Sequence, residues 1–154
     1  MKRIGVFPGS FDPFTKGHED IVRRFIPLFD EVIIAIGVNS TKKYMFTQDS
    51  RANHIRVLFA DERKVSVENF SGLTVDFCKE KKAQYLLRGI RNATDADYER
   101  SIAQMNNELY EIETLFLMCD PALAPINSSI IREIKRNNGD ISSFVTNDEL
   151  LIIN

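Results

Sequence analysis

The chain has 154 residues, the length of one domain with room for a sizeable hydrophobic core. Its residues are 44% hydrophobic and 27% charged, values that exclude a disordered protein and are ordinary for a soluble globular one. The net charge of −2 argues against a broad basic surface for nucleic acid, although it leaves room for a local cluster of cations.

Neither a signal peptide nor a membrane anchor is indicated. The apolar stretch Ile4–Pro8 is interrupted by Gly9 and is too short for a signal-peptide core, and nowhere do about 18 apolar residues run together. Cys78 and Cys119 lie far apart in apolar stretches without a C-x-x-C spacing, so neither metal binding nor redox chemistry is indicated. We therefore expect a cytoplasmic protein with no membrane partner.

Short apolar runs alternate with amphipathic segments along the chain. The runs predict five strands, which in chain order are residues 4–7, 32–38, 65–67, 85–87 and 115–118. The second and the fifth runs are apolar on both faces, as in strands that helices cover on both sides. The remaining segments predict helices at residues 21–29, 47–59, 73–81 and 94–110, from 128 or 129 to before 139, and for a turn or two within 146–153.

This alternation predicts the fold. Strands and helices that alternate at this spacing form a doubly wound, Rossmann-like α/β fold with a five-stranded parallel sheet. No linker, repeat or low-complexity tract divides the chain, so residues 1–154 are expected to form a single domain. Ligands of such sheets bind beyond the carboxyl ends of the strands, so the loops that follow the strands are the candidates for chemistry.

The first of these loops, residues 8–18, combines two prolines and Gly9 with Gly17-His18 at the start of a helix. Backbone N–H groups at a helix N-terminus attract anions, and glycine permits close approach of a phosphate. The loop has neither the Walker pattern nor the dinucleotide-binding G-x-G-x-x-G pattern. A lone histidine usually caps or packs, but the place of His18 where a ligand must bind favours donation to a phosphate oxygen.

Three further loops carry cations or hydroxyl groups. Lys42-Lys43 follows the second strand; lysine pairs are usually just solvated, but this pair lies at the carboxyl end of a buried strand. Arg88-Gly89-Ile90-Arg91 follows the fourth strand and offers two guanidinium forks to phosphate oxygens. Ser128 and Ser129 precede an apolar helical pattern, where they can act as N-caps and also present hydroxyl groups to a polyphosphate. Such groups position phosphates and stabilise charge rather than form covalent intermediates.

The segment Thr15-Lys16-Gly17-His18 matches the T-x-G-H pattern of the nucleotidyltransferase superfamily. From Arg3 to about Phe144 the chain resembles the bacterial phosphopantetheine adenylyltransferases, which convert ATP and 4′-phosphopantetheine to dephospho-coenzyme A and pyrophosphate. The segments that carry this resemblance are Pro8–Pro13 with Gly17-His18, Lys42-Lys43 with Met45–Thr47, Arg88–Arg91 with Asp97-Tyr98-Glu99, and Met105-Asn106-Asn107, followed by the serine motif.

The resemblance implies direct in-line attack of the acceptor phosphate on the α-phosphorus of ATP, without a general base. The residues that it implies for catalysis are His18, Lys42, Arg91 and Ser129. Those implied for 4′-phosphopantetheine are Ser10, Lys42, Leu73, Thr74, Arg88 and Asn106. Those implied for ATP are Ser10, Phe11, His18, Gly89, Ile90, Arg91, Glu99, Leu123, Ala124, Pro125, Ile126, Asn127, Ser128 and Ser129. Thr74 and Asn127 depart from the residues that the family usually has.

The resemblance also implies Mg²⁺ held largely by substrate oxygens and water, a homohexamer, and feedback binding of coenzyme A. Two alternatives stay open. Nicotinate-mononucleotide adenylyltransferases and glycerol-3-phosphate cytidylyltransferases share the first loop and a serine motif, whereas the Lys42 loop and the Arg88–Glu99 block favour the pantetheine enzymes. The other alternative is a non-catalytic nucleotide-binding module, against which the intact His18 and arginines argue.

Overall fold

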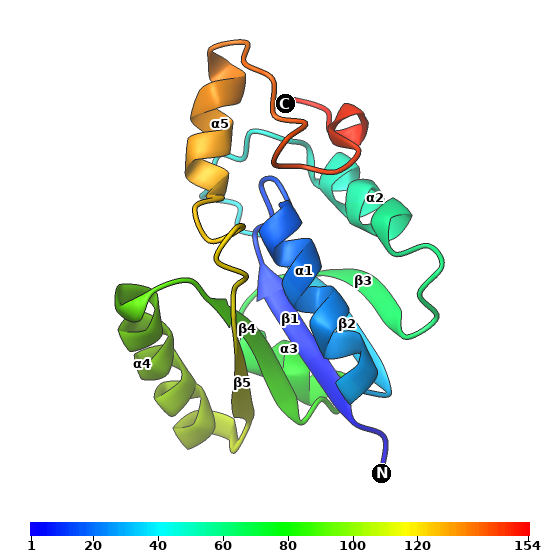
Figure 1. Cartoon of the computed structure of the whole chain (residues 1–154). Coiled ribbons are helices and arrows are strands. Elements are labelled where there is room, and N and C mark those ends of the chain that lie inside the picture. Colours follow the sequence, from blue (N-terminus) through cyan, green and yellow to red (C-terminus); the bar gives the residue numbers. More distant parts are fainter.

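The five apolar runs pair into one parallel sheet. The computed structural model describes residues 1–154. The strands are β1 (Ile4–Gly9), β2 (Glu31–Gly37), β3 (Val65–Phe70), β4 (Tyr85–Ile90) and β5 (Glu113–Met118). They lie in the order β3-β2-β1-β4-β5 and every neighbouring pair is parallel, which confirms the predicted five-stranded sheet (Figure 1).

Five α-helices follow the strands, close to the predicted positions. They are α1 (Lys16–Phe25), α2 (Gln48–Leu58), α3 (Thr74–Glu80), α4 (Ala93–Tyr110) and α5 (Ser128–Arg136). The first helix begins and ends earlier than the predicted residues 21–29. It stops at Phe25 because Pro27 lacks an N–H group, and the chain continues as the 3₁₀ turn Ile26–Leu28.

Helices cover both faces of the sheet. On one face, side chains of α1 and α2 pack on the strands in a cluster that includes Ile21, Ile55 and Ile34. On the other face, α3 packs Val75 and Phe77 among strand residues. Because both faces are covered over the central strands, β2 consists almost entirely of buried residues. The fold is therefore doubly wound, as predicted.

Strand β5 departs from the prediction that both of its faces are covered. Leu115, Phe116 and Met118 are 38%, 36% and 61% exposed. The reason is that β5 ends the sheet and pairs only with β4, so the chain by itself supplies too few elements to cover it. The apolar pattern of residues 115–118 therefore predicted a strand correctly but its coverage wrongly.

The predicted turn or two of helix within residues 146–153 is largely wrong. Only Asp148–Leu150 form a 3₁₀ turn. Beyond it, Ile153 pairs with Phe46 in an antiparallel bridge. The N–H group of Thr47 donates to the carbonyl oxygen of Ile152 at 2.8 Å. These backbone bonds to the segment before α2 draw the chain into an extended form instead of a helix.

A third apolar cluster lies beyond the carboxyl ends of the strands. It joins Phe46, Ile131 of α5, Ile141 and Val145, all of which are buried. Figure 1 shows α5 and the last residues gathered at this end of the sheet. The cluster fixes α5, and with it the loop that precedes α5, above the ends of β1 and β4.

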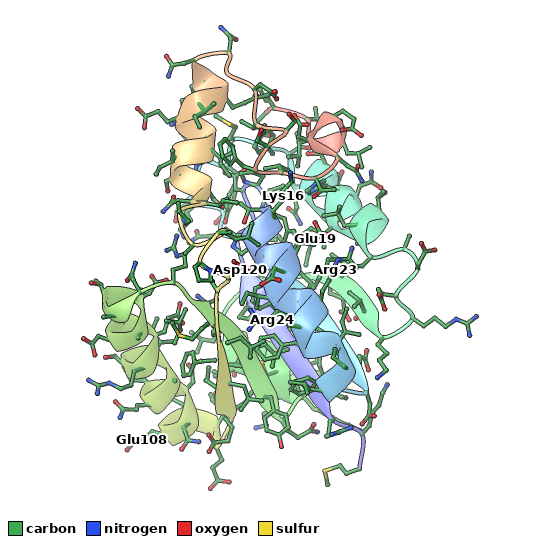
Figure 2. The ribbon with its side chains drawn as sticks, in the orientation of Figure 1. Lys16, Glu19, Arg23, Arg24, Glu108 and Asp120 are labelled. Carbon is green, nitrogen blue, oxygen red and sulfur yellow. The ribbon has the colours of Figure 1, made fainter.

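The outer side of α1 carries charged residues (Figure 2). The Arg23 guanidinium lies 2.8 Å from the Glu19 carboxylate, and Arg24 lies 3.1 Å from Asp20. Ion pairs at this i, i+4 spacing stabilise a helix modestly. None of the helices has the length and apolar composition needed to cross a bilayer.

Candidate active site

A cavity of about 380 Å³ opens beyond the carboxyl ends of β1 and β4, between the starts of α1 and α5. These two strands are neighbours in the sheet but not in the chain, and this is where a doubly wound sheet offers a crevice for a ligand. The sequence candidates that line the cavity are Ser10, Phe11, His18, Arg88, Gly89, Arg91, Glu99, Leu123, Ile126, Asn127, Ser128 and Ser129.

The loop after β1 brings its backbone to the cavity in an unusual conformation. Phe11 has φ +47°, in the left-handed region that non-glycine residues rarely adopt. A side chain on Gly9 would place its Cβ 2.7 Å from the Phe11 ring, so glycine is needed there. The buried Phe11 ring lies edge-on to the His18 ring, with centroids 5.2 Å apart.

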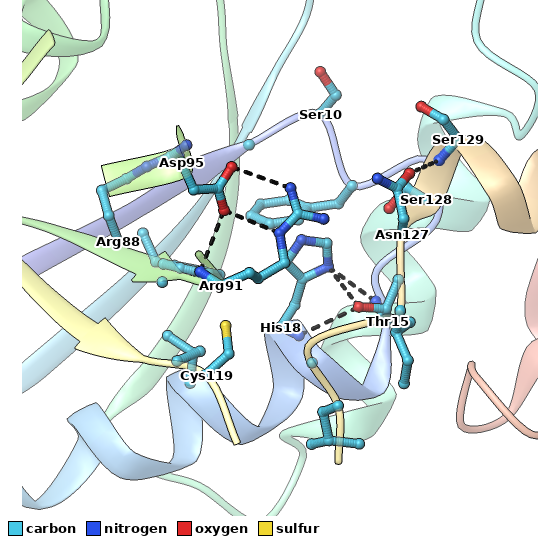
Figure 3. A pocket seen from close by; sticks show the side chains of 18 of the residues that line it. Ser10, Thr15, His18, Arg88, Arg91, Asp95, Cys119, Asn127, Ser128 and Ser129 are labelled. Atoms are coloured by element: carbon cyan, nitrogen blue, oxygen red, sulfur yellow. Dashed lines mark hydrogen bonds and ion pairs between the residues drawn. The ribbon is translucent and has the colours of Figure 1, made fainter. Parts of the chain in front are cut away.

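His18 is held by the start of α1. Thr15 is the N-cap, and the N–H group of Thr15 donates to His18 Nδ1 at 3.0 Å while the N–H group of His18 donates to Thr15 Oγ1 at 3.3 Å (Figure 3). This is a capping box in which histidine takes the place of the usual glutamate or glutamine. Because Nδ1 accepts a hydrogen bond, the proton of the neutral ring is on Nε2.

Burial keeps the His18 ring neutral. Loss of hydration, with smaller contributions from the cationic side chains of Arg88 and Arg91, lowers the pKa of His18 to about 4. At neutral pH the ring therefore carries one proton, on Nε2, and no net charge. Such a group can donate a hydrogen bond to a phosphoryl oxygen, but it is not a strong base.

Two carboxylates of α4 orient the two arginines. Glu99 accepts from both Nε and Nη2 of Arg88, while Arg88 Nη1 donates to the carbonyl oxygen of Pro8 at 2.8 Å. Asp95 accepts from Nε and Nη2 of Arg91 at 3.0 and 3.3 Å, and this contact lowers the pKa of Asp95. Arg91 keeps Nη1 unengaged, so it can bind a phosphate oxygen without releasing Asp95.

The start of α5 forms another wall of the cavity. The prediction that Ser128 or Ser129 caps this helix is wrong, because the Asn127 Oδ1 atom accepts from the N–H groups of Ser129 and Ile130 at 2.8 and 3.4 Å. The asparagine side chain is long enough to reach both N–H groups. Ser128 Oγ instead donates to the carbonyl oxygen of Pro13 at 3.0 Å, which ties α5 to the first loop.

A second cavity of about 250 Å³ adjoins the first. The two share Ser10, Arg88 and Glu99 on their linings. The second cavity adds the predicted acceptor contacts Thr74 and Asn106, together with apolar side chains of α4 and the sheet. One end of this space is therefore cationic and the rest is mixed apolar and amide, which suits a phosphorylated, elongated acceptor.

Five predicted residues lie outside both cavities. Lys42 is exposed on the loop after β2, and Leu73 is 58% exposed before α3. The other three are Ile90, which packs in the sheet, and Ala124 and Pro125 beside the lining residue Leu123. The structure thus gathers the His18, arginine and serine groups around one space, and leaves Lys42 outside its lining.

Arg132 and Asp95 are among the lining residues that were missed in the sequence. Arg132 donates to the carbonyl oxygen of Asp12 at 2.8 Å and to Ser129 Oγ at 3.1 Å, and Asp95 holds Arg91. Arg132 follows the predicted residue Ser129 by three positions, and Asp95 follows the predicted residue Arg91 by four. At this helical spacing side chains are neighbours, so the sequence could have indicated both. Cys119 also lines the cavity, but burial raises the pKa of its thiol and makes it a poor nucleophile.

The comparisons with known proteins agree with this geometry. The family model described as cytidylyltransferase-like matches residues 6–134. A phosphopantetheine adenylyltransferase of Flavobacterium psychrophilum is 52% identical over 93% of this chain and 95% of that protein. One of Cytophaga hutchinsonii is 53% identical over 94% of this chain and 97% of that protein.

Solved structures show the same fold at lower identity. A structure titled as that of a candidate nicotinate-nucleotide adenylyltransferase from Vibrio parahaemolyticus superposes with a TM-score of 0.70 at 19% identity, over 97% of this chain and 91% of that one. A bifunctional NMN adenylyltransferase/ADP ribose pyrophosphatase of Francisella tularensis, complexed with AMP and a manganese ion, gives 0.68 at 20% identity, over 98% of this chain and 46% of that one. On the family model and the close relatives together, the chain belongs to the nucleotidyltransferases and, among them, to the phosphopantetheine adenylyltransferases.

Proposed function

We propose that the chain performs the reaction of its family in the two adjoining cavities: the adenylyl group of ATP is transferred to 4′-phosphopantetheine, giving dephospho-coenzyme A and pyrophosphate. The observation that carries the proposal is the sharing of Ser10 and Arg88 between a phosphate-binding cavity and an amphipathic one. A reaction between two phosphates requires such a boundary, because nucleophile and electrophile must meet there.

The mechanism follows from the charges at this boundary. The acceptor phosphate is already an anion, so an oxygen of it attacks the α-phosphorus directly while the bond to pyrophosphate breaks, and no proton needs to be removed. Arg88 and Ser10 hold the acceptor phosphate, and Lys42 reaches it from its exposed loop. Arg91, Ser128 and Ser129 hold the departing β- and γ-phosphates.

His18 acts on the α-phosphoryl group. Its Nε2–H donates to an oxygen on which negative charge grows in the transition state, so its contribution is larger there than in the ground state. His18→Ala should therefore lower kcat by about a hundredfold or more while the KM values change little. If His18→Ala had a normal kcat and a greatly raised KM for ATP, this role of His18 would be contradicted.

The acceptor assay tests the whole proposal. Purified protein with ATP, Mg²⁺ and 4′-phosphopantetheine should release pyrophosphate, measured by a coupled phosphate assay. Nicotinate mononucleotide and glycerol 3-phosphate serve as acceptors for the two rival activities, and neither should replace 4′-phosphopantetheine. Turnover with one of them and none with 4′-phosphopantetheine would overturn the assignment.

The proposal includes a divalent cation, with Mg²⁺ as the physiological one. The chain has no group of three or more histidine, cysteine, aspartate or glutamate side chains arranged to hold a metal ion. Three acidic residues line the first cavity, and all are engaged: Asp95 and Glu99 by the arginines, and Asp12 by two backbone N–H groups. These residues do not fit a protein-held metal, which supports a cation that arrives with the triphosphate and is bound by its oxygens and water.

The exposed apolar face of α4 and β5 supports the proposal of a homo-oligomer, in the hexameric form expected for the family. Tyr98, Ile102, Met105 and Leu109 recur at helical spacing along α4 and are 37–68% exposed. With the uncovered side chains of β5 they form one apolar surface, of the kind that another copy covers. Met105→Glu should dissociate the assembly in analytical ultracentrifugation; a wild-type monomer at micromolar concentration would contradict the proposal.

Two further points complete the proposal. Coenzyme A retains the pantetheine arm, which supports feedback binding in competition with the acceptor. Neither Cys78 nor Cys119 is paired in a disulfide, which supports action in the reducing cytoplasm. Feedback binding can be tested by isothermal titration with coenzyme A in the presence and absence of 4′-phosphopantetheine. Competition would lower the apparent affinity for coenzyme A when 4′-phosphopantetheine is present.

A further inference from the structure

Arg51 is a buried cation that no catalytic role accounts for. It lies on α2, is 1% exposed, and lines neither of the two cavities. A buried guanidinium loses its hydration, and this lowers the stability of the fold unless the N–H groups are hydrogen-bonded and the charge is balanced. The partners of Arg51 therefore show what its burial achieves.

Those partners belong to two different active-site loops. Arg51 Nη1 donates to the carbonyl oxygen of Ser10, in the loop after β1. Arg51 Nε donates to the carbonyl oxygen of Phe46 at 3.1 Å, in the segment that ends the loop after β2. The side chain of Arg51 thus links the backbone at Ser10 to the backbone at Phe46, four residues after Lys42.

Asp12 makes the same connection from the opposite side. It is 5% exposed, and its two carboxylate oxygens accept from the N–H groups of Met45 and Phe46 at 2.8 and 2.9 Å. Burial lowers the pKa of Arg51, and the negative charge of Asp12 opposes that lowering. Asp12 and Arg51, which we call the loop brace, therefore cross-link the two loops through four hydrogen bonds.

The brace extends to both ends of the Lys42 loop through Tyr44. The Arg51 guanidinium lies over the Tyr44 ring, 4.2 Å from its centroid. The Tyr44 hydroxyl donates to the carbonyl oxygen of Gly37 at 3.4 Å and accepts from the N–H group of Asn39 at 3.2 Å. The loop that carries Lys42 is thereby closed at its base, although Lys42 itself is exposed.

We infer that Arg51 and Asp12 are positioning residues for the acceptor phosphate: they fix the distance between Ser10 and Lys42 through hydrogen bonds to the backbone. Arg51 lines neither cavity, and Asp12 lines the first one while its carboxylate is taken up by two N–H groups. The inference rests on the proposed function, in which these two residues hold that phosphate. ATP is held chiefly by α5, Arg91 and His18. The side chains of the brace are not bonded to these groups, and α5 meets the brace only at the backbone carbonyl oxygen of Asp12, which accepts from Arg132 and is kept in both variants below. Loss of the brace should thus affect the acceptor more than the nucleotide.

The test compares Arg51→Lys, which keeps the charge but loses the fork, with the wild-type enzyme. We expect the KM for 4′-phosphopantetheine to rise about tenfold, equivalent to about 1.4 kcal/mol, and the KM for ATP to stay within about twofold. Amide hydrogen exchange of Met45 and Phe46 in the substrate-free protein should accelerate about tenfold. Arg56→Met, on the same helix but exposed, is the matched control and should change none of these values.

Asp12→Asn provides the second variant if Arg51→Lys does not fold. It preserves the shape of the side chain and can still accept from one of the two N–H groups, so the same increase in acceptor KM is expected with a normal circular dichroism spectrum. Equal increases in both KM values, or faster exchange with unchanged kinetics, would overturn the inference. Lack of wild-type turnover with 4′-phosphopantetheine would refute the proposed function instead, since the inference concerns the ratio of variant to wild type.

Discussion

The protonation state of His18 can be tested without a substrate. Its pKa is lowered from 6.5 to about 4, chiefly by burial and further by Arg88 and Arg91. This lowering corresponds to about 3 kcal/mol of preference for the neutral ring, at about 1.4 kcal/mol for each tenfold change in the ionisation constant. The ring should therefore remain neutral at pH 6, where an unperturbed histidine is mostly charged.

The lowering also sets the pH dependence of stability. Since the folded pKa lies below the unfolded one, the unfolded chain takes up the proton first as the pH falls. The contribution of His18 is complete above about pH 6.5 and is lost progressively toward pH 4, with about 2 kcal/mol gone by pH 5. His54 also has a lowered pKa, but it is present in both wild type and a His18→Gln variant, so its effect cancels in their difference.

Two measurements check this reasoning. In nuclear magnetic resonance titrations, the ring signal that disappears in His18→Gln should have a midpoint near pH 4 and the nitrogen shifts of a ring protonated at Nε2. In urea unfolding, the stability advantage of wild type over His18→Gln should shrink by about 2 kcal/mol between pH 7 and pH 5. A midpoint between pH 6 and 7, or an advantage independent of pH, would refute the burial argument.

Three further predictions concern the same site and its support. Asp95→Asn removes the negative charge that orients Arg91 and should raise the KM for ATP about threefold to tenfold in steady-state kinetics; an unchanged KM would show that Arg91 needs no such partner. Ile131→Ala leaves a cavity at the buried position of α5 and should lower the free energy of urea unfolding by about 2–5 kcal/mol. Chelation with EDTA should stop turnover but leave the melting temperature of the substrate-free protein unchanged, because no side-chain cluster holds a metal; a falling melting temperature would reveal a structural ion.

The strands and helices could be predicted from local patterns. Alternation of apolar runs and amphipathic segments depends only on neighbouring residues, and Thr47 was recognisable as the N-cap of α2. The exposure of β5 was not predictable. An apolar run indicates a strand whose side chains favour burial, but it does not show whether other elements of the same chain pack on them. The end of the chain was mispredicted as helix because its bonds to the residues around Phe46 are long-range.

The candidate site divides in the same way. His18, Arg88 and Arg91 could be found because each lies near or beyond the carboxyl end of a strand and carries a group that can bind phosphate. Arg51 could not, because it sits inside a helix among residues of no obvious pattern, and its partners at Ser10 and Phe46 become visible only in three dimensions. Residues that touch a ligand leave a local signature, whereas those that hold the loops in place do not.

The pairing of β1 with β4 has a consequence for the whole sheet. Only Gly5–Tyr85 and Val6–Leu86 face each other there, whereas β4 and β5 are in register over six residue pairs, from Tyr85–Glu113 to Ile90–Met118. Beyond Val6 no further residues of the two strands pair, and the side chain of Arg88 joins them instead, through its bond to the carbonyl oxygen of Pro8. In the proposed reaction, phosphates that bind residues after β1 and residues at the end of β4 link these two strands where they do not pair. Unfolding of the liganded enzyme then also has to break the contacts of the phosphates with residues that follow both strands.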